Sequence, residues 1–225
     1  TLVITRSLGL EATAIWSIAT KLFMLSQQLV YRVLDFSTAA FSEMMVRGEK
    51  SRLQTRFRDV IVLTGSAAAV VGLTMAVCNE SFLILWTQNR IAWPAANHLL
   101  MAVSLLVYAI TRCHIGLACL TKNVGRMKYI YFAEGLAFVA FGSLATPYLG
   151  LTGVILGGII TNLLLSGIFG FRRSATYFET HVQELAITWL RQPLLVFRND
   201  AHQGPANNQA GQGGDGLAGH PVPPR

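Results

Sequence analysis

The sequence predicts an all-α fold, a polytopic membrane helix bundle with five spans. Hydrophobic residues fill 52% of the 225 positions and charged residues only 13%, whereas about a quarter of the residues of a soluble domain are charged. Long apolar stretches recur along the chain, and the segments between them alternate between basic and nearly uncharged. This alternation is typical of membrane topology. Because the basic residues are dispersed between apolar stretches, they predict no nucleic-acid surface.

The five spans follow from the length of the apolar stretches, since a helix of about 20 mostly apolar residues crosses some 30 Å of hydrocarbon. They are expected at about 13–43, 60–79, 97–120, 129–146 and 152–171. The third span is expected to start near Asn97, because Pro94 fits a helix entrance better than a helix interior. The turn residues of PYLGLTG at 147–153 divide the last apolar stretch into two short spans.

The loops predict the orientation of these spans. Lys and Arg gather in residues 44–59, in 121–128 and at 172–173, whereas the intervening loops hold only Arg90. Cytoplasmic loops of membrane proteins carry an excess of Lys and Arg. Residues 1–178 are therefore expected to form one transmembrane lobe with its N-terminal edge outside and its C-terminus in the cytoplasm.

Both ends of the chain carry further predictions. Residues 179–198 are expected to form an amphipathic helix on the cytoplasmic membrane surface, with Thr180 and Gln183 in capping-box spacing. Residues 199–225 hold almost no apolar bulk and are predicted to be disordered. The chain opens with TLVITRSLG, without an initiator methionine or a signal peptide. Thr1 is therefore expected to be an internal position of a longer protein.

The first span carries an unusual load of polar residues along one face. At 100° per residue, the polar residues fall within an arc of roughly 80°, and they are Lys21, Gln28, Arg32, Asp35 and Ser42. A charge at the centre of a span costs about 2.5–3.5 kcal/mol, so such residues usually face a bundle interior or a wet cavity. Two alternatives stay open: Lys21 snorkels to the interface, or Arg32 and Asp35 neutralise each other.

A second polar stripe follows three- and four-residue spacing on the 97–120 span, and its members are Ser104, Tyr108, Thr111 and Arg112. It predicts either a second cavity wall or small polar groups that join helices. Glu134 is expected to pair with an arginine or to lie near the interface. The glycines of GLTGVILGG, at 153, 157 and 158, predict close helix packing.

Enzyme and metal chemistry are not indicated by the sequence. It holds no phosphate loop, no nucleophile with its base and no metal-ligand spacing such as CxxC or HExxH. We therefore expect no catalytic residue, no metal and no cofactor. Cys78, Cys113, Cys119 and His114 are interpreted as buried structural residues.

Four segments together resemble a known family. They are ITRSLGLEATAIWSIATKLFMLSQQLVYRVLDFSTAAFSEM, SFLILW, GLACLTKNVGRMKY and PYLGLTGVILGGIITNLL. Their order is similar to the C-terminal half of polysaccharide-biosynthesis transporters, the lipid-linked oligosaccharide flippases of the O-antigen type, in the multidrug/oligosaccharidyl-lipid/polysaccharide exporter superfamily. The resemblance implies two six-helix lobes around a cavity that opens alternately to either side. The five spans would form most of the second lobe.

The resemblance also implies a function in the bacterial inner membrane. The expected substrate is an undecaprenyl-diphosphate-linked glycan, and the expected partners are membrane lipid and a glycan polymerase or glycosyltransferases. In this hypothesis Lys21, Arg32 and Arg112 supply positive charge for the pyrophosphate. Hydrogen bonds to sugar hydroxyls are expected from Gln27, Gln28, Ser42 and Tyr108. Asp35 would position Arg32 or take up a coupling ion.

Two other functions stay open. The first is a multidrug or cation antiporter of the same superfamily, in which Asp35 or Glu134 would be the proton or sodium site. The second is a non-transporting scaffold partner in envelope-glycan assembly. The charge of the cavity discriminates between the transporters, because an anionic substrate favours a net positive lining and a cationic drug favours the reverse.

Overall fold

The computed structural model describes residues 2–88, 93–121 and 125–180, and it confirms the all-α prediction. Helices account for nearly all of these residues, and no strand occurs among them. The elements are α1 (Leu2–Ala19), α2 (Lys21–Val46), α3 (Lys50–Thr87), α4 (Ala95–Leu120), α5 (Met127–Leu149), α6 (Leu151–Asn162), the π-helix η1 (Leu163–Gly167) and α7 (Ile168–Phe178). The predicted surface helix at 179–198, beyond Thr180, and the predicted disordered tail at 199–225 lie outside the described residues.

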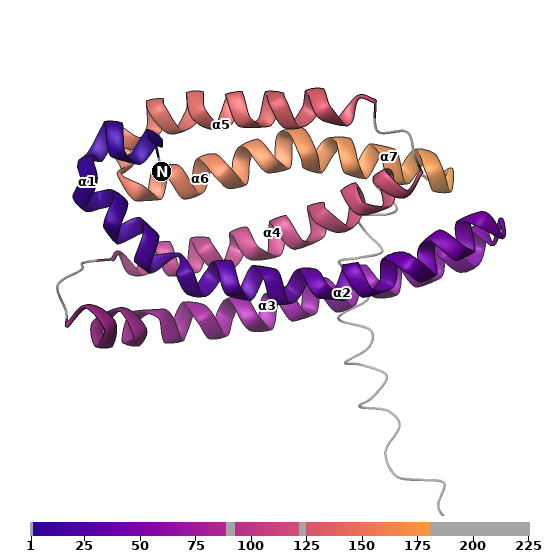
Figure 1. Cartoon of the computed structure of the whole chain (residues 1–225), viewed down its shortest axis with the longest axis horizontal. Coiled ribbons are helices and arrows are strands. Elements are labelled where there is room, and N and C mark those ends of the chain that lie inside the picture. The colour runs from indigo at the N-terminus through magenta and orange to yellow at the C-terminus, as the bar shows by residue number, and fades with distance from the viewer. Residues whose placement is uncertain (1, 89–92, 122–124, 181–225) are drawn as a thin grey trace, which may run out of the picture.

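The long helices run side by side, and α4 lies at the centre of the bundle (Figure 1). Helix α4 packs against α2 and α3 on one side and against α6, η1 and α7 on the other. Helix α5 pairs with α6, and α1 crosses one end of the bundle to contact α5 and α6. The core therefore follows α4, which is the most buried of the helices that are apolar enough to span a membrane.

The observed helices match the five predicted spans in number if the bent pair α1–α2 counts as one span, and they differ in their limits. Four helices are long and apolar enough to cross a membrane, and the bent pair α1–α2 makes up to five. Helix α4 begins just after Pro94, and Gly150, with φ of 57°, separates α5 from α6, as expected. The first predicted span at 13–43 is instead two helices that meet at an angle of 41°.

Helix α3 is much longer than the predicted 60–79 span, because residues 50–59 and 80–87 are also helical. Lys, Arg, Gln and Leu all have good helix propensity, so the helix continues where the sequence becomes charged. At about 1.5 Å per residue, its 38 residues span more than the hydrocarbon thickness. A three-residue turn is all that separates α2 from α3.

The bend between α1 and α2 is supported by a buried side chain from α3. The amide nitrogen of Asn79 lies 3.2 Å from the Ala19 carbonyl oxygen and 3.0 Å from Nδ1 of His98. Asn79 is fully buried. At the bend, Thr20 donates its hydroxyl hydrogen back to the Trp16 carbonyl, a bond that often bends helices. Asn79 thus donates a hydrogen bond to the Ala19 carbonyl at the break between the helices. Water would not reach this carbonyl inside an apolar bundle.

One end of the bundle carries a cluster of packed aromatic rings. Phe57 of α3 contacts the rings of Phe41, His114 and Phe178. The Nδ1 atom of His114 lies 2.8 Å from the Ser174 hydroxyl oxygen. His114 is therefore a core residue, as predicted.

The prediction for the cysteines is correct for one and wrong for two. Cys113 is buried, whereas Cys78 and Cys119 are exposed. In a membrane bundle an exposed apolar face is compatible with lipid, so Cys78 does not need protein around it. Cys119 instead lines the groove between α2 and α5.

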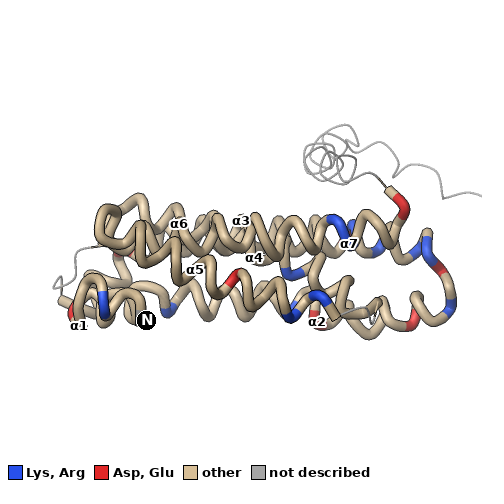
Figure 2. The backbone as a smooth tube through the Cα atoms, turned by 90° about the horizontal axis from the view of Figure 1, so that it is seen from above, with Lys and Arg blue, Asp and Glu red and all other residues tan. Residues whose placement is uncertain are grey.

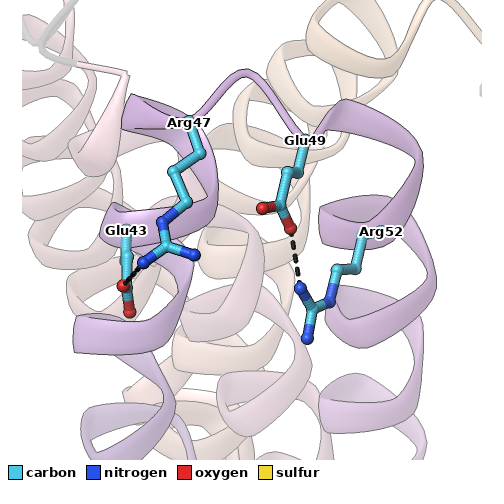
Figure 3. Close-up of polar contacts among 4 residues, drawn as sticks. All are labelled: Glu43, Arg47, Glu49 and Arg52. Atoms are coloured by element: carbon cyan, nitrogen blue, oxygen red, sulfur yellow. Dashed lines mark hydrogen bonds and ion pairs between the residues drawn. The ribbon is translucent and has the colours of Figure 1, made fainter.

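The basic segments gather at one end of the molecule, which we call the basic end. It consists of the α2–α3 turn, the start of α5 and the end of α7 (Figure 2). Some of its charges are neutralised locally, since Glu43 pairs with Arg47 and Glu49 with Arg52 (Figure 3). Lys50 of α3 lies 2.5 Å from the Glu179 carboxylate, and this hydrogen bond lowers the pKa of Glu179.

Asn79→Ala tests the support of the bend. We expect a loss of about 1–3 kcal/mol in the free energy of unfolding, because the Ala19 carbonyl and His98 both lose their partner. The matched control is Thr74→Ala on the same helix, where the exposed hydroxyl bonds only to the Val70 carbonyl; it should change stability by less than about 0.5 kcal/mol. Equal stability of the two variants in detergent micelles would contradict this role of Asn79.

Candidate functional site

A polar groove of about 710 Å³ lies between α2 and α5. Residues of α2 and α5 form its walls, and residues of α4, α6 and η1 form its floor. Helix α2 packs on α4, and α5 packs on α6, so the two walls stand on neighbouring helices. The groove occupies the middle of the bundle and the half nearer the basic end, because its α4 residues begin at Tyr108 and its α5 residues end at Phe138.

Arg112 of α4 bridges the floor to the α2 wall. Its Nη2 atom donates to the Asp35 carboxylate at 3.1 Å, and its guanidinium lies 4.4 Å from the centre of the Tyr31 ring. The Tyr31 hydroxyl accepts a hydrogen bond of 2.7 Å from the Gln27 amide. The side chains of Arg112 and Asp35 remain 45% and 42% exposed, so the pair is also open to a molecule in the groove.

Glu134 of α5 forms a second polar cluster on the opposite wall. One carboxylate oxygen accepts a 2.9 Å hydrogen bond from the Asn162 amide, and the other accepts from the Ser166 hydroxyl. The amide oxygen of Asn162 is buried and has no partner among the described residues. The cluster therefore offers acceptor oxygens to a ligand that donates hydrogen bonds or carries positive charge.

The backbone is irregular where this cluster forms. Asn162 ends α6, and Ser166 lies in the five-residue π-helix that follows. Single π turns inside α-helices occur frequently at functional sites. Gly167, also in this turn, lies so close to Asn162 that a Cβ there would be 3.3 Å from the Asn162 carbonyl oxygen.

The glycines of the last hairpin pack closely, as their spacing predicts. A Cβ at Gly153 would lie 3.0 Å from the backbone of Ala145, and a Cβ at Gly157 would lie 2.9 Å from the Phe141 ring. A Cβ at Gly158 would collide with the Tyr108 hydroxyl. Gly158 therefore allows Tyr108 to reach across the groove floor from α4 to α6.

The structure brings together three of the six predicted site residues. Tyr108, Asp35 and Arg112 line the groove, whereas Lys21, Gln28 and Arg32 are exposed on α2 and do not line it. At 100° per residue, the stripe that contains these three is rotated by roughly 80° from the face that lines the groove, and Asp35 lies where the two faces meet. The partner of Asp35 is Arg112, so the predicted pairing with Arg32 is replaced by one between helices.

Several groove residues were missed by the sequence predictions. They are Tyr31 and Thr38 on α2, Tyr131 on α5, and Thr161, Asn162 and Ser166 on the last span, whereas Gln27 was among the residues expected to bond to the sugar. Glu134 was expected to pair with an arginine or to lie near the interface, and it bonds instead to Asn162 and Ser166. A signal was present, because Asn162 and Ser166 lie four residues apart in a mostly apolar span and so share one helix face.

The charge of the groove also differs from the prediction. The groove is lined by two carboxylates, Asp35 and Glu134, and by one guanidinium, Arg112. The expected net positive lining is therefore not found in this groove. The difference arises because Lys21 and Arg32 lie on the neighbouring face of α2.

No group of His, Cys, Asp and Glu in residues 2–88, 93–121 and 125–180 could hold a metal ion. Comparison of the chain with protein-family models, with curated proteins and with solved structures finds no match. The resemblance to polysaccharide transporters therefore remains a prediction from the sequence.

A double-mutant cycle tests the Asp35–Arg112 bridge. We expect Asp35→Asn and Arg112→Gln to be non-additive by about 0.5–1.5 kcal/mol in the free energy of unfolding, because they remove the same contact. The matched cycle combines Asp35→Asn with Arg32→Gln and should be additive within about 0.5 kcal/mol. Coupling to Arg32 that equals or exceeds coupling to Arg112 would contradict the observed pairing.

Proposed function

We propose that this chain forms part of a membrane transporter whose groove between α2 and α5 binds the polar part of its substrate during alternating access. The observation that carries the proposal is the placement of Asp35, Arg112 and Glu134 in a half-open groove within an apolar helix bundle. Ionisable residues at membrane depth are costly and usually mark a substrate or ion pathway.

The substrate class that we propose is a lipid-linked oligosaccharide, with an undecaprenyl-diphosphate-linked glycan as the expected form. The uncharged polar side chains of the lining support it, whereas the excess of carboxylates in the groove does not. Amide, hydroxyl and phenol groups of Gln27, Thr38, Tyr108 and Asn162 suit the many donors and acceptors of a sugar. Arg112 supplies a guanidinium for a diphosphate. A groove between two helices also allows the lipid tail to stay in the bilayer while the polar group lies in the protein.

The proposed orientation places the basic end in the cytoplasm of a bacterial cell, since Lys and Arg flank the spans there. The groove would then receive its substrate from the cytoplasmic side, where such glycans are assembled. Glycosyltransferases or a glycan polymerase are the partners that we propose, because they would make or use such a glycan.

A second candidate function is a cation-coupled or cation-exporting antiporter. The observation that favours it is the excess of carboxylates over guanidinium in the groove. Glu134, with the unpaired amide oxygen of Asn162 beside it, is the best cation acceptor among the described residues. The same site in a glycan transporter would take up the coupling ion.

Glycan export tests the first candidate in cells that carry the full-length protein. We expect Arg112→Gln to lower export about tenfold or more, because it removes a charge-assisted contact with the diphosphate. The matched control is Arg56→Gln at the basic end, where the arginine pairs with Asp59 outside the groove. Both variants are checked for normal membrane insertion. Unchanged glycan export by the Arg112→Gln variant would contradict the glycan proposal.

Glu134→Gln separates the two candidates. An antiporter should lose efflux of a cationic dye and its dependence on the proton or sodium gradient, because the neutral amide cannot bind a cation in place of the carboxylate. Glu11→Gln on α1, outside the groove, is the matched control. Dye efflux that is absent in the unmodified protein would exclude the second candidate. If no groove variant changed glycan export or dye efflux, the result would favour the scaffold function.

A further inference from the structure

A second hollow lies on the other side of α5, near the basic end, and it has a volume of about 630 Å³. It shares no lining residue with the groove. Its walls are the start of α5 and the stretch that runs from η1 into α7. The hollow is therefore a separate feature of the molecule and does not depend on which substrate the groove takes.

The part of this hollow nearer the basic end is strongly basic. Arg126 enters it from the start of α5, and Arg172 and Arg173 enter it from α7. None of the described residues that line it is acidic. Arg126 and Arg172 thus bring two guanidinium groups to one space, and their planar forks suit the oxygens of a phosphate.

The part of the hollow farther from the basic end is apolar. Leu164, Leu165 and Ile168 line it, and Leu164 and Ile168 are 59% and 44% exposed. Along the helix, Leu164 and Arg172 are separated by about 12 Å at 1.5 Å per residue. The order of surfaces from apolar to cationic matches the order of groups in a phospholipid, from acyl chain to phosphate.

We infer that this hollow binds one anionic phospholipid from the leaflet at the basic end. Its phosphate lies between Arg126 and Arg172, and its acyl chains lie against Leu164, Leu165 and Ile168. Basic pockets between helices at the cytoplasmic side of a membrane are known sites for anionic headgroups, and the cytoplasmic leaflet is itself anionic. A zwitterionic lipid gains less, because its own cation is repelled by the same arginines.

Binding of tail-labelled phosphatidylglycerol to the purified full chain in neutral detergent micelles tests this inference. We expect tighter binding than for tail-labelled phosphatidylcholine. The double variant Arg126→Gln/Arg172→Gln should weaken phosphatidylglycerol binding about tenfold and leave phosphatidylcholine binding unchanged. Each single variant should weaken it by about threefold to fivefold, so the singles decide the question if the double variant fails to fold.

The matched control is Arg52→Gln/Arg56→Gln, which removes the same charge from the basic end but outside the hollow. It should change the affinity by less than about twofold, since these arginines are exposed and screened. An equal loss in both double variants would overturn the inference, because it would indicate diffuse attraction to the whole basic end. Equal affinity for the two lipids would also overturn it. Complete displacement by inorganic phosphate would assign the hollow to a free anion instead.

Discussion

The ion pair between Arg112 and Asp35 is the interaction on which the groove depends. It joins α4, the centre of the bundle, to α2, which forms one wall. In an apolar bundle, either charge alone would be costly, and the partner across the helix interface offsets that cost. Because both side chains are only partly covered, the pair can be rearranged by a ligand with its own charge. The same ion pair thus holds α2 against α4 and offers two charged groups to a ligand in the groove.

Other polar groups in the bundle follow the same constraint, that each must find a partner inside the protein. Asn79 pairs the carbonyl at the bend between α1 and α2, His114 pairs with Ser174, and Glu134 pairs with Asn162 and Ser166. The first two contacts are fully buried and fix the fold. The Glu134 contact lies in the groove, and the amide oxygen of Asn162 still has no partner among the described residues. This free acceptor distinguishes the polar residues that are available to a ligand from those that only hold the fold.

The sequence predicted the all-α bundle because apolar length and turn residues are local signals, as at Pro94 and Gly150. It predicted Tyr108, Asp35 and Arg112 because their spacing places them on polar helix faces. It did not predict which face of α2 meets the groove, since the 41° bend at Thr20 and the packing on α4 set the rotation of that helix. The cluster around Glu134 joins residues from two spans, and only their packing brings them together. Lys21, Gln28 and Arg32 show that a polar stripe alone does not locate a cavity.

The central claim is that the groove is open to water within the membrane, and substituted-cysteine labelling tests it most directly. In a background without the native cysteines, Thr38→Cys and Tyr131→Cys line the groove. Leu29→Cys and Leu136→Cys lie on the opposite faces of the same two helices, where Leu29 and Leu136 are 66% and 62% exposed. We predict that a membrane-impermeant thiol reagent labels the first pair many times faster than the second in intact membranes. Equal, slow labelling of all four positions would contradict a wet groove.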